Sequence, residues 1–133
     1  MRQILRDTRV IALVGWSARP ERPSHGVAAY LARRGYRVIP VNPGLAGRVT
    51  AWGEPVRARL ADIAEAVDMV DIFRNSDAVE AVVDEALAVL PGLRVVWMQL
   101  GVRNEAAAGK ARAAGVDVVM DRCPAIEIPR LFG

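Results

Sequence analysis

Five short segments rich in apolar residues recur along the chain, each followed by a glycine or a polar residue. Residues 10–14 form a continuous apolar run, which is typical of a strand buried on both faces of a parallel sheet. In the second segment Pro40 lacks a backbone N–H, so we expect a free side or a local irregularity there. The predicted strands are residues 10–14, 38–41, 67–73, 94–100 and 116–120.

Segments with helical periodicity separate these strands. The clearest is 78–90, where valines and alanines recur at the spacing of one helix face, and a polar residue among 75–77 is expected to cap it. The others are 23–34, which stops at Gly35, a short helix at 60–65, and a helix from its cap Asn104 to residue 114. The tail, 125–133, is expected to pack back onto the sheet.

Strands that alternate with helices at this spacing predict right-handed crossovers and a parallel sheet. We therefore expect one Rossmann-like α/β domain, with three layers, five parallel strands and helices on both faces. Ligands of such sheets bind outside the carboxyl ends of the strands. The functional residues should then come from five places: 15–24, 42–48, 73–77, 99–104 and 121–124.

Composition narrows the chemistry of the 133-residue chain. A single cysteine, Cys123, and a single histidine, His25, exclude a disulfide scaffold and a Cys/His zinc module. A hydrolase with a Ser-His-Asp or Cys-His catalytic site would also have to use His25, the single histidine. No apolar run is long enough for an export signal or a membrane span, so a cytoplasmic protein is expected.

The basic residues are scattered, and the net charge of +3 is a weak field, so no nucleic-acid partner is expected. Of the 18 basic residues only Lys110 is a lysine. Arginine grips phosphate with paired N–H groups, so a few arginines are candidates for an anionic ligand. A GC-rich genome would produce the same arginine excess.

The loop after the first strand begins with Gly15, has a hydroxyl residue at Ser17 and leads into a helix. Such a loop presents backbone N–H groups and a helix N-terminus to an anion, although an ordinary polar loop would look similar. It lacks the G-x-G-x-x-G pattern. An NAD-binding domain is also expected to carry an acidic residue at the end of its second strand, and this chain has Asn42 there.

Several motifs together point to a family. In order, they are Ile11-Ala12-Leu13-Val14-Gly15-x-Ser17, Arg34-Gly35-Tyr36-Arg37-Val38-Ile39-Pro40-Val41-Asn42-Pro43, Val70-Asp71-Ile72-Phe73-Arg74, Trp97-Met98-Gln99-Leu100-Gly101 and Val119-Met120-Asp121-Arg122-Cys123-Pro124. In this order and spacing they resemble the small single-domain CoA-binding proteins of bacteria. Those proteins are relatives of the CoA-binding N-terminal domain of the succinyl-CoA synthetase α subunit.

The resemblance implies a site for coenzyme A. It places the CoA phosphates on the first loop, the nucleotide end beside the second strand, and the rest of the cleft beside the third and fourth. Arginines on loops at the same edge would add phosphate contacts. The site residues so expected are Gly15, Trp16, Ser17, Ala18, Arg19, Arg22, Val41, Asn42, Pro43, Phe73, Arg74, Gln99, Leu100 and Gly101.

The chain also departs from the synthetase domain. A lysine that follows the Pro-Gly turn there corresponds to Leu45 here, so a 3′-phosphate contact would have to come from Arg48 or Arg22. The synthetase passes phosphate through a histidine in a second domain, and His25 does not correspond to it. The resemblance therefore implies binding of CoA or an acyl-CoA without catalysis.

Two residues keep two interpretations each. His25 is either a polar residue at a helix start or a ligand contact. Cys123 is either a small core residue or a thiol facing the pantetheine end of CoA. Trp16 is a candidate to stack on adenine, whereas Trp97 is expected in the core. Asp68 and Asp71 are expected on opposite faces of one strand, unsuited to acid–base work as a pair.

Two other functions remain open at this stage. One is an NAD(P)-binding, oxidoreductase-like domain, which the missing glycine pattern and Asn42 oppose. The other is a ligand-sensing subunit of a larger complex, whose protein partner supplies the chemistry.

Overall fold

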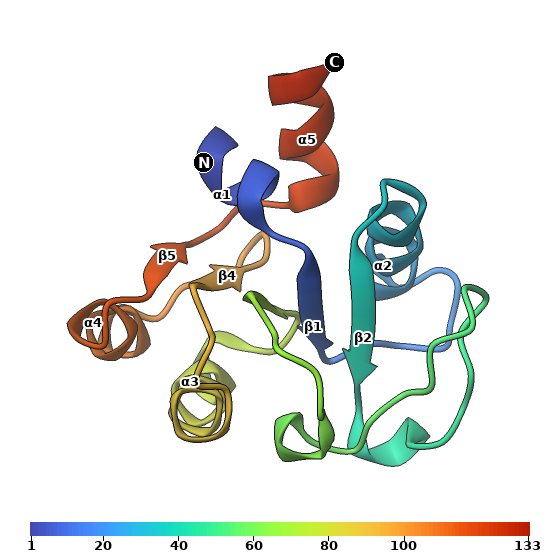
Figure 1. Ribbon diagram of the computed structural model, residues 1–133, viewed down its shortest axis with the longest axis horizontal. Coiled ribbons are helices and arrows are strands. Elements are labelled where there is room, and N and C mark those ends of the chain that lie inside the picture. Colours follow the sequence, from blue (N-terminus) through green and yellow to red (C-terminus); the bar gives the residue numbers. More distant parts are fainter.

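The five apolar segments form the strands of one parallel sheet in the computed structural model, which describes residues 1–133 (Figure 1). The strand order is β2-β1-β3-β4-β5, and all four neighbouring pairs run parallel. The strands are β1 (Val10–Val14), β2 (Arg37–Val41), β3 (Met69–Ile72), β4 (Val95–Met98) and β5 (Asp117–Val119).

One helix follows each of β1, β3 and β4, and two more lie at the ends of the chain. The helices are α1 (Arg2–Asp7), α2 (Pro23–Arg33), α3 (Val79–Val89), α4 (Glu105–Ala113) and α5 (Pro124–Phe132). The segment expected as a helix at 60–65 is only a 3₁₀ turn, η2 (Leu60–Asp62); two further turns of this kind are η1 (Pro43–Leu45) and η3 (Ser76–Ala78).

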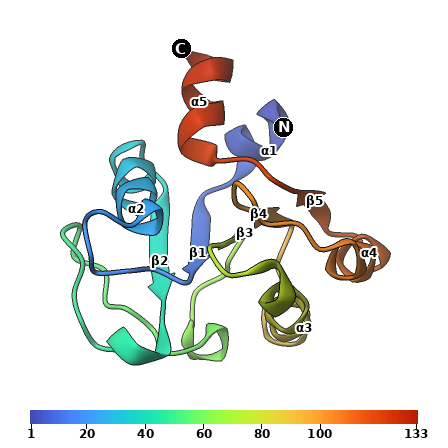
Figure 2. The ribbon, with the colours of Figure 1, turned by 180° about the vertical axis from the view of Figure 1, so that it is seen from behind.

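Alternate residues of each strand pack against different helices. Ile11 and Leu13 of β1 face a cluster with α1, α2 and α5, whereas Ala12 and Val14 face a larger cluster with α3 and α4. The terminal helices α1 and α5 lie side by side at one end of the molecule (Figures 1 and 2). The protein is therefore a three-layer, Rossmann-like α/β domain, as the sequence predicted.

The expected helix caps have different outcomes. Asn104 caps α4 through Oδ1, which accepts from the N–H of Ala107 at 2.9 Å. No side chain of 75–77 caps α3, because Ser76 lies in the turn η3 and its hydroxyl accepts from the N–H of Arg103 at 3.1 Å instead. The expectation for α3 was wrong, since Ser76 joins the ends of β3 and β4.

β2 forms one edge of the sheet, as expected for a strand that contains Pro40. The loop 46–57 folds back over its outer side. The Trp52 indole donates to the carbonyl of Val38 at 3.0 Å. The N–H of Arg57 donates to the carbonyl of Pro40, also at 3.0 Å. Arg57 also pairs in parallel with Val41, so the end of this loop runs beside the end of β2.

The tail forms α5, with Ile128 fully buried and Leu131 packed at its margin. Ile126 and Phe132 remain exposed, so only part of the expected apolar group packs against the body of the protein. None of the helices combines the length and the apolar character that crossing a membrane would require.

Candidate functional site

The neighbouring strands β1 and β3 send their following helices to opposite faces of the sheet. After β1 the chain enters α2 on one face, and after β3 it enters α3 on the other. Such a switch point opens a crevice at the carboxyl edge of a parallel sheet. Gly15 and Phe73, the first residues after these two strands, lie at this point.

Gly15 has a backbone conformation that suits only glycine. Its φ is +89°, and a Cβ at this position would lie 2.2 Å from the carbonyl oxygen of Phe73. The N–H of Gly15 donates to the carbonyl of Val41 at 2.9 Å, which ties the loop to β2. The glycine is thus required by the close crossing of two chain segments, and its N–H is not free for a phosphate.

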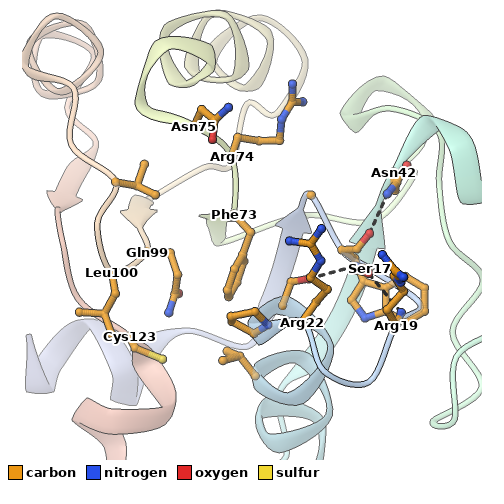
Figure 3. Close-up of a pocket in the computed structure, with 16 residues that line it drawn as sticks. Ser17, Arg19, Arg22, Asn42, Phe73, Arg74, Asn75, Gln99, Leu100 and Cys123 are labelled. Carbon is orange, nitrogen blue, oxygen red and sulfur yellow. Dashed lines mark hydrogen bonds between the residues drawn. The ribbon is translucent and has the colours of Figure 1, made fainter.

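A cavity of about 540 Å³ opens at this crevice (Figure 3). Its walls come from the loop after β1, the start of α2, and the ends of β2, β3 and β4, with Cys123 from the start of α5. The lining residues are Gly15, Trp16, Ser17, Arg19, Arg22, Pro23, Ser24, Val27, Asn42, Phe73, Arg74, Asn75, Gln99, Leu100, Val102 and Cys123.

A second hollow of about 230 Å³ lies next to the cavity, on the side of β2. Gly15, Asn42 and Arg74 line both, so the two spaces share one wall. Its remaining lining includes Val41 at the end of β2, Pro43 of the turn η1, Arg59, and one acidic residue, Glu85 of α3. An extended ligand would therefore meet a continuous surface from Arg59 to Cys123.

Most of the residues predicted from the sequence meet here. Ten line the cavity: Gly15, Trp16, Ser17, Arg19, Arg22, Asn42, Phe73, Arg74, Gln99 and Leu100. Val41 and Pro43 line the second hollow. Ala18 and Gly101 line neither space, and the N–H of Gly101 donates to the Asp121 carboxylate at 2.7 Å.

The loop after β1 has fewer free N–H groups than its sequence suggests. The N–H of Ser17 donates to the hydroxyl of Ser24 at 3.0 Å, and that of Arg19 donates to the hydroxyl of Ser17 at 3.1 Å. The N–H groups of Trp16 and Ala18 make no hydrogen bond within the protein. Trp16 lines the cavity, so its N–H is a backbone donor that the loop keeps for an anion there, whereas Ala18 lines neither space.

Asn42 holds the two loops of the site together. Its Nδ2 donates to the carbonyl of Trp16 at 2.7 Å, and its Oδ1 accepts from the N–H of Gly44 at 2.9 Å. Each end of the amide thus makes one hydrogen bond within the protein. Asn42 shapes the wall between the two spaces and lines both, and its contact with the nucleotide stays a prediction.

The charge of the cavity wall has one sign. Arg19, Arg22 and Arg74 line it, and no acidic residue does. Arg19 pairs with Glu21 at 3.3 Å, but both side chains are exposed, so this pair is weak and easily exchanged for another anion. The cavity therefore favours a negatively charged ligand.

Trp16 and His25 are fixed against each other. Their rings stack with centroids 5.6 Å apart, and His25 Nδ1 lies 3.0 Å from the carbonyl of Ser17. Because Trp16 is only 4% exposed, its ring is largely covered and has little face left to stack on adenine. His25 lines neither space, which agrees with a structural role at the start of α2.

The two aspartates at β3 differ in their burial and in their hydrogen bonds. Asp68 precedes the strand, and its carboxylate accepts from the N–H groups of Arg9 and Val10, both at 2.9 Å. Asp71, in the middle of β3, is 0% exposed and has no hydrogen-bond partner. Burial raises the pKa of the Asp71 carboxyl well above its usual range, because the charged form loses its hydration there.

The far wall of the cavity is apolar except for Gln99 and Cys123. Trp97, two residues before Gln99 on β4, is fully buried as expected, and its indole donates to the carbonyl of Arg122 at 2.8 Å. Cys123 is both a buried residue and part of the cavity lining, so the two interpretations of its position are compatible. No group of three or more His, Cys, Asp or Glu side chains is gathered where it could hold a metal ion.

The site residues expected from the sequence included neither Arg59 nor Asn75. Asn75 lies in the segment 73–77, from which functional residues were expected, although it was not singled out. Arg59 comes to the site only because Arg57 pairs beside Val41, and no local pattern reveals that pairing. Arg48, by contrast, lines neither space.

Comparisons with known proteins show the family to which the chain is related. The family described as CoA binding domain matches residues 9–129. The uncharacterized protein YneT of Bacillus subtilis is 36% identical over 123 residues, which is 92% of this chain and 87% of that protein.

Solved structures show the same architecture. The Thermus thermophilus protein named cell-free ID.343 is 40% identical, with a TM-score of 0.92 over 98% of this chain and 96% of that one. A dinucleotide forming acetyl-coenzyme A synthetase 1 of Ca. Korarchaeum cryptofilum shares the fold, with a TM-score of 0.73 and 23% identity over 90% of this chain and 27% of that one. On the extent of the family match and of the identity to its relatives, this chain belongs to the CoA-binding domain family.

Proposed function

We propose that the protein binds coenzyme A or an acyl-CoA in the cavity at the carboxyl edge of its sheet, and catalyses no reaction by itself. The observation that carries the proposal is the cavity wall with three arginines and no acid, at the switch point between β1 and β3. Its volume of about 540 Å³ lies within the range of small-molecule sites.

The arrangement suits the parts of CoA in order. The pyrophosphate would lie against the loop after β1, where the N–H groups of Trp16 and Ala18 are free and Arg22 and Arg74 are near. The nucleotide end would lie in the second hollow, against Val41 and Pro43. The pantetheine arm would then extend along Phe73 toward Gln99 and Cys123.

An NAD(P)-binding function has less support. The residue after β2 is Asn42, whose amide bonds to Trp16 and Gly44, and the acidic side chain that holds a ribose hydroxyl in NAD-binding domains is missing there. The absence of a reaction of its own is supported by His25, the one histidine, which contacts a backbone carbonyl outside the cavity lining.

Titration calorimetry with CoA, dephospho-CoA, acetyl-CoA, NAD and ATP in parallel tests the proposal. We expect saturable binding of CoA or acetyl-CoA and much weaker binding of NAD. Tight binding of NAD without binding of CoA would overturn it. Incubation with acetyl-CoA, followed by chromatography of the products, checks for turnover, and hydrolysis or transfer by the protein alone would contradict the second part.

A matched pair of variants tests the site. Arg74→Ala should weaken CoA binding by about tenfold or more, because a charge-assisted contact to phosphate contributes roughly 1.5–3 kcal/mol. Arg112→Ala removes another exposed arginine, on α4 and away from the cavity, and should leave the affinity unchanged. Equal affinities for both variants would remove Arg74 from the site.

A further inference from the structure

The wall of the cavity opposite the arginines carries a thiol and an amide that the protein itself does not use. Gln99 and Cys123 are each 5% exposed, and both line the cavity. The side-chain oxygen of Gln99 is buried without a hydrogen-bond partner, and Cys123 is a free cysteine. Figure 3 shows the two side chains on the same side of the cavity, across from Ser17 and Asn42.

The backbone around Cys123 is held in place from several directions. The carbonyl of Arg122 accepts from the indole of Trp97, and the carboxylate of Asp121 accepts from the N–H of Gly101. Asp121 has a φ of +59°, a conformation that turns the chain sharply between β5 and α5. Cys123 then precedes the first turn of α5, and its carbonyl accepts from the N–H of Glu127 at 2.9 Å. The thiol is therefore fixed against the wall formed by β4.

An unpaired buried amide is costly unless a ligand satisfies it. The pantetheine arm of CoA carries amide groups along its length and a sulfur at its end, so it offers Gln99 a partner and Cys123 a reactive atom. The arginines at the opposite wall would hold the phosphates, and the pantetheine arm would then extend toward Gln99 and Cys123. Within the proposed function, on which this inference rests, Gln99 and Cys123 lie where the sulfur end of the ligand arrives.

We propose that Cys123 is a thiol–disulfide exchange site for coenzyme A, with Gln99 positioning the pantetheine arm. The co-reactant is a disulfide of CoA, either oxidised CoA or CoA joined to another small thiol. The Cys123 thiol loses its proton to water, and its sulfur attacks the CoA sulfur. The disulfide bond breaks, a bond between Cys123 Sγ and CoA forms, and the other thiolate leaves and takes up a proton.

The burial of Cys123 makes the exchange selective. A small disulfide without a nucleotide gains nothing from the arginines and meets a thiol that is 5% exposed. A CoA disulfide held by its phosphates instead presents its sulfur at a high effective concentration. We expect CoA disulfide to react faster than glutathione disulfide by about a hundredfold.

Intact-mass spectrometry of the reduced protein, followed over time with CoA disulfide or glutathione disulfide, tests the proposal. The expected result is one CoA adduct per chain, removed by dithiothreitol and absent from Cys123→Ser. Gln99→Ala should slow the reaction with CoA disulfide but not with glutathione disulfide. Unfolded protein should react with both reagents at similar rates, which shows that the fold causes the selectivity.

Calorimetry with CoA separates the possible failures. Arg112→Ala, on α4 and outside the cavity lining, should bind reduced CoA and form the adduct as the original protein does. If CoA binds and no adduct forms on the native protein, or if both disulfides react equally fast, the exchange site is refuted and the proposed function stands. If CoA does not bind at all, the proposed function fails as well.

Discussion

The backbone carbonyl of Phe73 lies directly against Gly15, at 2.2 Å from the place that a Cβ of residue 15 would occupy. The segments that leave β1 and β3 thus cross at their closest point where the site begins. Arg74, the next residue, reaches both the cavity and the second hollow because of this crossing. The backbone contact is therefore a condition for the shape of the site.

Gly15→Ala should destabilise the fold strongly. The new methyl group would meet backbone atoms that cannot move aside, and alanine is strained at a φ of +89°. We expect a loss of about 3 kcal/mol or more in the free energy of unfolding, measured by urea denaturation. Gly26→Ala is the control, because Gly26 lies in α2 with open space around it and should gain about 0.5–1 kcal/mol. Similar stabilities for the two variants would contradict this account of Gly15.

Asn42→Ala should loosen the wall between the two spaces. It removes the hydrogen bonds to Trp16 and Gly44, and we expect a loss of about 1–3 kcal/mol in stability together with weaker CoA binding. Asn42→Asp keeps an acceptor for the N–H of Gly44 but sets a carboxylate against the carbonyl of Trp16. If calorimetry shows unchanged CoA affinity for both variants, the bridge is not needed for binding.

Arg59 should contact the 3′-phosphate of CoA in place of the lysine that is missing at Leu45. It lines the second hollow, beside the proposed nucleotide end. Arg59→Ala should weaken CoA by about tenfold and leave dephospho-CoA unchanged, because the two ligands differ only in that phosphate. Arg48→Ala, outside both spaces, is the control. An equal loss for both ligands would assign Arg59 to another part of CoA.

Asp71 should make the protein less stable as the pH rises. The folded state keeps its carboxyl protonated, whereas the unfolded chain releases the proton above a pKa of about 3.9. Between these two pKa values, each pH unit should lower stability by about 1.4 kcal/mol through this group. Urea unfolding from pH 4 to pH 7 should thus show Asp71→Asn gaining stability relative to the original protein with increasing pH.

The sequence predicted the sheet well because its strands are buried on both faces. Continuous apolar runs such as Val10–Val14 have few alternatives in a domain of this size. The five loops expected at the carboxyl edge all contribute to the cavity, since parallel strands bring their ends to one edge whatever their order. Ten of the predicted site residues follow from this rule together with the family resemblance.

Other features depend on contacts that no local pattern reveals. The helix α1 is short and was not expected, and α5 contains Pro129, which obscures its helical periodicity. Arg59 reaches the site through a pairing between Arg57 and Val41. The amide of Asn42 makes hydrogen bonds to Trp16 and to Gly44, which lie in two different loops. These relationships arise from tertiary packing, so residue types alone could not predict them.

The covered outer side of β2 has a consequence for behaviour at high concentration. Open sheet edges are templates on which other chains add strands and aggregate. Here the 46–57 loop occupies carbonyls of β2 at one edge, and the strand at the other edge, β5, has only 3 residues. The sheet thus offers no long edge on which self-association could propagate, and the fold should resist fibril formation even when it is crowded.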